Sequence, residues 1–139
     1  MWLAKLCIIL GTVVLVRAQT VYYNCPDGWV TDQPNKRCYN FIFYPKLPYV
    51  LAAKSCAESF SSLVSVTTSV EHSFINEYLL AHDSNRYEWY TSGRKDLNNG
   101  YVWEGEGVKL SDVSPVLNFW MTGYQKVPQE RLIYKFDPT

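Results

Sequence analysis

An apolar run of eleven residues, Leu6 to Val16, stands near the start of the chain and follows a single basic residue, Lys5. Val16-Arg17-Ala18 closes the run with small or apolar side chains at the two positions that a signal peptidase reads. A spanning helix needs about 20 apolar residues, so the run is too short for a membrane anchor. The pattern predicts a secretory signal peptide over residues 1–18.

Removal of the signal would leave residues 19–139, a length that suits one domain. The signal carries Lys5 and Arg17 and no acidic residue. Residues 19–139 therefore contain 11 basic and 13 acidic residues, a net charge of −2. A near-neutral balance gives no reason to expect nucleic acid, whose binding depends on Lys and Arg neutralising phosphates. The predicted mature protein is extracellular, with no nucleic-acid partner and no polybasic run for membrane lipid.

Secretion places the remaining cysteines in an oxidising compartment, where paired thiols are the default. Cys7 would leave with the signal, and Cys25, Cys38 and Cys56 would stay. An odd number leaves one thiol without an internal partner.

A small hairpin is predicted between the first two of these cysteines. Cys25-Pro26-Asp27-Gly28-Trp29 reads as a turn that leads into a strand, and Asp32-Gln33-Pro34-Asn35 reads as a second turn. The stretch from Cys38 to Tyr44 is rich in aromatic and β-branched residues, which favours a strand. Together these segments suggest a hairpin closed by a Cys25–Cys38 disulfide, with Cys56 left as an unpaired or intermolecular thiol.

Two helices are predicted in the middle of the chain. Pro48 is suited to open the first, because its missing N–H costs nothing there. Thr68 and Glu71 form a capping box at the start of the second, which His82-Asp83-Ser84-Asn85 ends. The apolar stripe of the first helix is Tyr49, Ala53, Cys56 and Phe60, and that of the second is Val70, Phe74, Ile75, Tyr78 and Leu79.

The other apolar segments are short and favour β-structure. Asn98-Asn99-Gly100 is a strong hairpin signal, and the segment from Gly105 to Pro115 is predicted to be a long loop. The predicted strands are Leu63–Val66, Tyr87–Thr91, Tyr101–Trp103, Leu117–Trp120 and Leu132–Tyr134. Two helices followed by short strands and long loops predict an α+β architecture.

The order and spacing of several motifs resemble the long form of the C-type lectin-like domain, from Cys25 to about Tyr134. The matching segments are Cys25–Trp29, Cys38-Tyr39, Tyr49, Ala52, Cys56, Leu63–Val66, Glu71, Phe74-Ile75, Trp89–Gly93, Tyr101–Trp103 and Trp120–Gly123. The resemblance implies two helices flanking short antiparallel strands with long loops. It also implies that Cys56 is the first cysteine of the core disulfide, and that the module recognises carbohydrate.

The usual calcium triplet is absent. The family commonly places Glu-Pro-Asn or Gln-Pro-Asp after the glycine of its Trp-x-x-Gly landmark, whereas Gly123 is followed here by Tyr124-Gln125-Lys126. Calcium takes six to eight oxygen ligands, and Lys126 offers a cation instead. The motif therefore does not support calcium as a cofactor, although Glu104, Glu106 and Asp112 remain open as weak ligands. Tyr124, Gln125 and Lys126 are the candidate ligand-binding residues, beside a Trp120 interpreted as core.

The resemblance also implies a domain that is incomplete at its C-terminal end. Similar domains have a cysteine near the position of Leu132, and they continue past Thr139 with the partner cysteine of Cys56 and a closing strand. The last strand is therefore expected to be missing, which would leave an open sheet edge, a known site of association. A natural truncation, a fragment and a module completed by a partner chain all fit.

No catalytic set is found, and the protein is expected not to be an enzyme. His72 and His82 are ten residues apart and too few for a zinc site. Glu104 and Glu106 would share one face of a strand and suit glycoside hydrolysis, but a solvated loop is the better interpretation. The two leading functions are a glycan-binding lectin and a calcium-independent protein-binding module, with a homodimer disulfide-linked through Cys56 as one form of the second.

Overall fold

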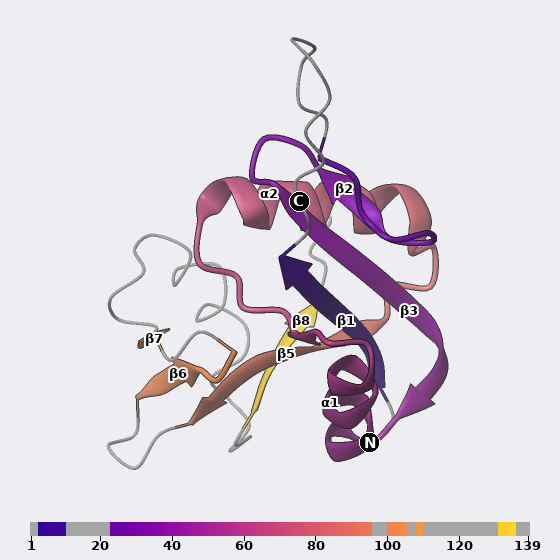
Figure 1. The fold of residues 1–139 in the computed structure, drawn as a ribbon. Coiled ribbons are helices and arrows are strands. Elements are labelled where there is room, and N and C mark those ends of the chain that lie inside the picture. Colours follow the sequence, from indigo (N-terminus) through magenta and orange to yellow (C-terminus); the bar gives the residue numbers. More distant parts are fainter. Residues whose placement is uncertain (1–2, 11–22, 96–99, 106–107, 110–130, 136–139) are drawn as a thin grey trace, which may run out of the picture.

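The computed structural model describes residues 3–10, 23–95, 100–105, 108–109 and 131–135 (Figure 1). The chain is α+β, with two helices and a mixed sheet, as the sequence predicted. Its elements in order are β1 (Leu3–Leu10), β2 (Val30–Asp32), β3 (Arg37–Leu47), α1 (Tyr49–Glu58), β4 (Ser62–Leu63), α2 (Ser69–His82), β5 (Glu88–Lys95), β6 (Tyr101–Trp103), β7 (Val108–Lys109) and β8 (Arg131–Lys135).

The described strands form one eight-stranded sheet. Its main path runs β2-β3-β1-β5-β6-β7, with β4 paired to β1 and β8 paired to β5. β1 and β5 are parallel and the other pairs are antiparallel. The expectation of purely antiparallel strands was therefore wrong. It had set residues 1–18 aside as a signal, whereas residues 3–10 supply a central strand of this sheet.

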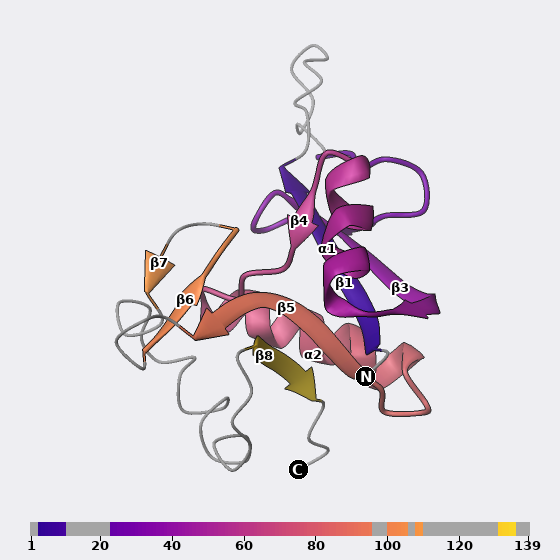
Figure 2. The ribbon, with the colours of Figure 1, turned by 90° about the horizontal axis from the view of Figure 1, so that it is seen from below.

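The two helices pack on opposite faces of the sheet (Figures 1 and 2). Successive residues of a strand point to opposite faces, so β1 contributes to both sides. Leu6 is buried on the α2 side with Trp89 and Ile75, whereas Cys7 is buried on the α1 side with Ala52. The core thus has two layers that share β1 and β5.

Helix α1 begins where the sequence predicted, because Pro48 is the residue before its first turn and accepts from the amide of Ala52 at 2.9 Å. Its predicted stripe is correct at Cys56, which is fully buried, and wrong at Phe60, whose side chain is 98% exposed. The helix ends at Glu58, and Phe60 adopts a positive φ of 52°. The Ser61 amide then bonds back to the Cys56 carbonyl at 3.0 Å. This helix-ending turn points Phe60 into solvent.

Helix α2 also begins as predicted, with the Thr68 hydroxyl accepting from the amide of Glu71 at 3.1 Å. The Glu71 carboxylate accepts from the amide of Thr67 at 3.0 Å, one residue earlier than in the usual capping box. Ile75 and Leu79 are buried as expected, and Val70 is 57% exposed. The buried side chain in that turn is the carboxylate of Glu71 itself, because it faces the hairpin.

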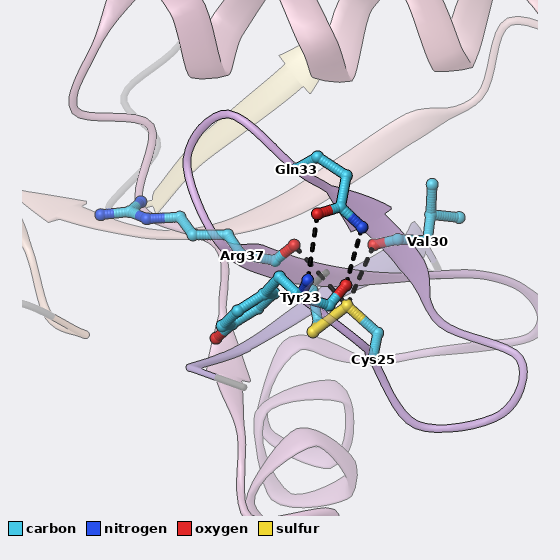
Figure 3. Close-up of a disulfide and its surroundings, with 6 residues drawn as sticks. Tyr23, Cys25, Val30, Gln33 and Arg37 are labelled. Carbon is cyan, nitrogen blue, oxygen red and sulfur yellow. Dashed lines mark hydrogen bonds between the residues drawn. A yellow bond between two sulfur atoms is a disulfide. The ribbon is translucent and has the colours of Figure 1, made fainter. Parts of the chain in front are cut away.

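The predicted hairpin is present as β2 and β3, and Cys25 and Cys38 form the predicted disulfide, with a Cα–Cα distance of 5.5 Å (Figure 3). Gln33 closes the start of the segment, because its amide group donates to the carbonyl of Tyr23 at 2.8 Å and accepts from its N–H at 3.1 Å. Gly28 adopts a φ of 82°, which a residue without Cβ takes at no cost.

The C-terminal half matches the predictions in part. β5, β6 and β8 cover the predicted strands, and β5 and β6 pair as the hairpin signal indicated. β7 lies inside the stretch expected to be a loop, and the strand expected at Leu63–Val66 is reduced to β4. Val64 nevertheless bridges two strands, since its amide donates to Leu6 and its carbonyl accepts from Ser92. Asn98, Asn99 and the strand predicted at 117–120 lie outside the described residues.

Cys56 is not a free thiol in this structure. It forms a disulfide with Cys7, with a Cα–Cα distance of 5.4 Å, and the described cysteines are all bonded. The expectation of an unpaired or intermolecular Cys56 followed from removing Cys7 with the signal. The chain of 139 residues retains Cys7 and places it against α1. Removal of residues 1–18 remains a prediction.

Candidate functional site

The three candidate ligand-binding residues, Tyr124, Gln125 and Lys126, lie outside the described residues. The structure does describe the strands on either side of the segment 110–130 that contains them. β7 precedes this segment and pairs with β6, and β8 follows it and pairs with β5. Trp103 pairs with Gly93, and Arg131 pairs with the neighbouring Arg94. The strands before and after the segment thus pair with β6 and β5, which pair with each other. We call the paired residues of these two strands the β5–β6 platform (Gly93–Lys95 and Tyr101–Trp103).

A charged cluster lies at the edge of this platform. The Nε atom of Arg94 is 2.6 Å from Oε1 of Glu104, and the Tyr49 hydroxyl donates to Oε2 of the same carboxylate at 3.1 Å. The side chains of Arg94 and Glu104 are 42% and 39% exposed. An ion pair with this exposure contributes little to stability. Because both side chains are partly exposed, they are also accessible from solvent.

The cluster joins α1 to the sheet. Tyr49 comes from the first residue of α1, and its ring packs edge-on against Tyr90 of β5 with centroids 5.3 Å apart. Burial raises the pKa of Tyr90, whose ring is 5% exposed. The packed ring fixes Tyr49, and Tyr49 in turn orients the Glu104 carboxylate.

Small side chains hold the platform close to β4. The hydroxyls of Ser65 and Ser92 are 2.6 Å apart and buried, and the Glu104 amide donates to the Ser92 carbonyl at 3.1 Å. A Cβ on Gly105 would stand 3.0 Å from Oγ of Ser65 and 3.2 Å from Oγ of Ser62. A side chain at position 105 would force these two hydroxyls to shift by a few tenths of an ångström, so the close approach favours glycine after Glu104.

Glu104 lies in a turn beyond β6, not on a strand, and Glu106 lies outside the described residues. The turn at Glu104 agrees with the loop that was preferred for this residue over a strand. Glu104 is instead paired with a guanidinium and a phenol. This arrangement suits contact with a polar ligand, because the guanidinium of Arg94 carries hydrogen-bond donors and the carboxylate of Glu104 beside it carries acceptors.

A second surface cluster was missed by the sequence reasoning. The hydroxyls of Tyr44 and Tyr87 are 2.6 Å apart, and Asn85 donates to the Tyr87 hydroxyl at 3.1 Å. Nζ of Lys46 lies 3.6 Å from the centroid of the Tyr87 ring, within reach of a cation–π contact. The bond with Tyr44 raises the pKa of Tyr87. Because these residues come from β3 and from the turn before β5, no local sequence pattern could join them.

The two histidines lie on α2 and do not meet. Nδ1 of His82 is 2.8 Å from the carbonyl oxygen of Tyr78 at the helix end, and burial lowers the pKa of His72. Within the described ranges, no three His, Cys, Asp or Glu residues are grouped to hold a metal ion. The described helices include none that is long and apolar enough to span a membrane.

The described fold is an α+β domain with a disulfide-closed hairpin, compatible with a C-type lectin-like fold. Comparisons point to the same class. The chain is 30% identical over 93 residues to C-type mannose receptor 2 of Homo sapiens, an alignment that covers 67% of this chain and 6% of the receptor. It is 29% identical over 97 residues to the secretory phospholipase A2 receptor of Homo sapiens, covering 68% and 6%.

A third relative is Contactin of Drosophila melanogaster, 31% identical over 71 residues, which cover 51% of this chain and 5% of that protein. The chain therefore aligns with only a small part of each of these relatives. No family profile matches the chain, and no solved structure matches it. The similarity suggests a lectin-like family at low identity.

Proposed function

We propose that the protein is a secreted, non-enzymatic recognition module that binds an extracellular ligand beside the β5–β6 platform. The observation that carries the proposal is the half-exposed cluster at this platform, in which Glu104 is paired with Arg94 and accepts a hydrogen bond from Tyr49. Tyr124, Gln125 and Lys126 are the ligand-binding residues that the family resemblance implies. A glycan is the ligand that the family resemblance implies.

The candidate residues favour contact without calcium. Lys126 falls within the triplet that carries oxygen ligands in the family, and Glu104 is already paired with Arg94 and Tyr49. A tyrosine ring can stack on a sugar face, and a tyrosine or arginine can equally anchor a protein interface. A protein ligand is therefore the second candidate, and the lysine in the triplet is the observation that favours it.

Glycan-array binding of the secreted protein, with and without EDTA, tests the proposal. We expect sugar binding that EDTA does not reduce. Tyr124→Ala and Lys126→Ala should each abolish this binding. Arg94→Gln should weaken the binding, whereas Arg86→Gln is the matched control, since Arg86 lies in the turn after α2. Loss of binding in EDTA would instead indicate that a calcium ion takes part in ligand binding. Silence across the array would favour the protein ligand.

A further inference from the structure

Two tyrosines from separate parts of the sheet meet at the surface. Tyr44 lies in β3, and Tyr87 is the residue before β5. Their hydroxyl oxygens are 2.6 Å apart, and their rings lie edge-on with centroids 6.2 Å apart. β1 lies between β3 and β5 in the sheet, so the contact joins two segments that are not neighbours there. We call these two residues the tyrosine pair.

The ring of Tyr87 is held by contacts that do not involve Tyr44. Nζ of Lys46 lies 3.6 Å from the centroid of this ring. Phe43 packs against the same ring with centroids 6.4 Å apart, and it also packs edge-on against the buried Trp89 at 4.9 Å. The Tyr87 ring is therefore fixed between the core and a lysine, and its hydroxyl is presented to Tyr44 in one place.

The tyrosine pair is open to solvent. Tyr44 is 68% exposed and Tyr87 is half-buried. A dissolved oxidant can therefore reach the pair, and protons that the phenols release can pass to water. Tyr49 and Tyr90 also pack edge-on, with centroids 5.3 Å apart, but Tyr90 is 5% exposed. Close rings and solvent access thus occur together at the tyrosine pair and not at Tyr49 and Tyr90.

Two phenols in this arrangement are suited to oxidative coupling. Loss of one electron and one proton from a tyrosine leaves a phenoxyl radical, whose unpaired electron is shared between the oxygen and the ortho carbons of the ring. The ortho carbons are bonded to the carbon that carries the hydroxyl, so two hydroxyls in contact bring ortho carbons of the two rings near each other. Because both radicals would form on one chain, their coupling needs no encounter between molecules.

We propose that the tyrosine pair is a site of oxidative cross-linking, at which a haem peroxidase acting with hydrogen peroxide joins Tyr44 to Tyr87 as an intramolecular dityrosine. The cross-link ties the end of β3 to the turn before β5. It involves neither Arg94 nor Glu104, so the proposal is independent of the ligand that binds beside the β5–β6 platform.

The reaction balances with one molecule of hydrogen peroxide. Each tyrosine gives up one electron and one proton, and an ortho carbon of one ring then forms a C–C bond with an ortho carbon of the other. The hydrogen on each bonded carbon moves to the neighbouring oxygen, which restores both phenols. Hydrogen peroxide takes up the two electrons and the two protons and becomes two molecules of water. The product is therefore lighter than the original chain by two hydrogen atoms.

The cross-link closes a long loop, because its two tyrosines are 43 residues apart in the sequence. A bond across such a loop removes conformations from the unfolded chain, while the folded chain already holds the two rings together. The cross-linked protein should therefore unfold at a Tm higher than that of the untreated protein by about 5 °C or more.

Peroxidase treatment of the full chain at low protein concentration tests the proposal. The monomer is separated from any dimer by size-exclusion chromatography, reduced and digested with trypsin. Residues 38–46 and 87–94 are released as separate peptides, because each follows a basic residue and ends with one. In the treated monomer we expect these two peptides to be joined, with fragment ions that assign the link to Tyr44 and Tyr87 and not to the other tyrosine of each peptide.

Tyr44→Phe and Tyr87→Phe each remove one phenol and keep the ring. Either substitution should lower the yield of the joined peptides about tenfold or more and abolish the rise in Tm. Tyr78→Phe is the matched control, because Tyr78 is also half-buried but stacks on Phe41, with centroids 4.0 Å apart. Its yield should equal that of the parent. Thermal unfolding before treatment establishes that each variant is folded.

Three results would each overturn the proposal. The first is a treated monomer without joined peptides, or with a link at other tyrosines. The second is dityrosine confined to dimers, which would show that the exposed phenols couple only between molecules. The third is a yield that Tyr44→Phe or Tyr87→Phe leaves unchanged, because the C–C bond then forms without one of the two proposed phenols.

Discussion

Nη1 of Arg37 donates to Oε1 of Glu71 at 2.6 Å and so joins the first residue of β3 to the first turn of α2. The side chain of Glu71 is 1% exposed, and that of Arg37 is 23% exposed. The same carboxylate accepts from the Tyr39 hydroxyl at 2.8 Å and from the Thr67 amide at 3.0 Å. One buried carboxylate therefore connects the disulfide-closed hairpin to the second helix.

Glu71→Gln should lower the free energy of unfolding by about 3 kcal/mol, because it leaves a guanidinium and a phenol with a weaker acceptor in a buried place. Chemical denaturation at neutral pH measures the loss. The exposed pair Lys54–Glu58, with a distance of 3.9 Å, provides the control. Lys54→Gln should change stability by no more than about 0.5 kcal/mol. Equal effects of the two substitutions would contradict the role given to Glu71.

The Cys25–Cys38 disulfide closes a short loop, since its two cysteines are 13 residues apart. Replacing both by alanine should cost about 3 kcal/mol in the chain-entropy treatment of such loops. The loss should appear in denaturant unfolding under non-reducing conditions. The Cys7–Cys56 bond stays intact and serves as the internal reference. A variant as stable as the parent would mean that the hairpin is already held by Gln33 and its two bonds to Tyr23.

The sequence predicted those features that depend on neighbouring residues. Pro48 and Thr68 start their helices for local reasons, and the hairpin turns follow from Gly28 and Asp32-Gln33-Pro34-Asn35. These positions satisfy backbone groups within a few residues, so the pattern is visible in the chain itself. Trp89 and Trp103 lie in strands that the sequence also predicted, and both are buried.

Long-range pairing was not visible from the sequence. Glu71 meets Arg37 across 34 residues, and the cluster around Tyr87 meets Tyr44 across 43. The largest miss, β1, has a different cause. Residues 3–10 satisfy two patterns at once, since an apolar run suits both a signal peptide and a buried central strand. The run was predicted to be a signal peptide, which stays a prediction, and the structure shows that residues 3–10 also form a strand.

Phe60 provides a test of the turn that ends α1. Its side chain is 98% exposed, so Phe60→Ala should leave stability nearly unchanged. Its φ of 52° is costly for a residue with a Cβ, so Phe60→Gly should be more stable than Phe60→Ala by up to about 1 kcal/mol. Thermal and denaturant unfolding of the two variants give the comparison. An alanine variant more stable than the glycine one would show that the turn does not hold this conformation.

The pH dependence of stability should contain a contribution from His72. Burial lowers its pKa below the ordinary 6.5, so the unfolded chain binds a proton more readily than the folded one. Both states hold a neutral ring above this value, and the penalty appears as the pH falls through 6.5 toward the lower folded pKa. Stability should therefore decrease on acidification across this window.

His72→Gln removes this titration while leaving the carboxylates of the chain in place. The free energy of unfolding of parent and variant, measured from pH 7.5 down to 5.0, should give curves that diverge below about pH 6.5, with the parent losing more. His82→Gln is the matched control, because His82 lies exposed at the end of the same helix. Parallel curves for the parent and the His72 variant would show that this ring gains its proton equally well in the folded protein.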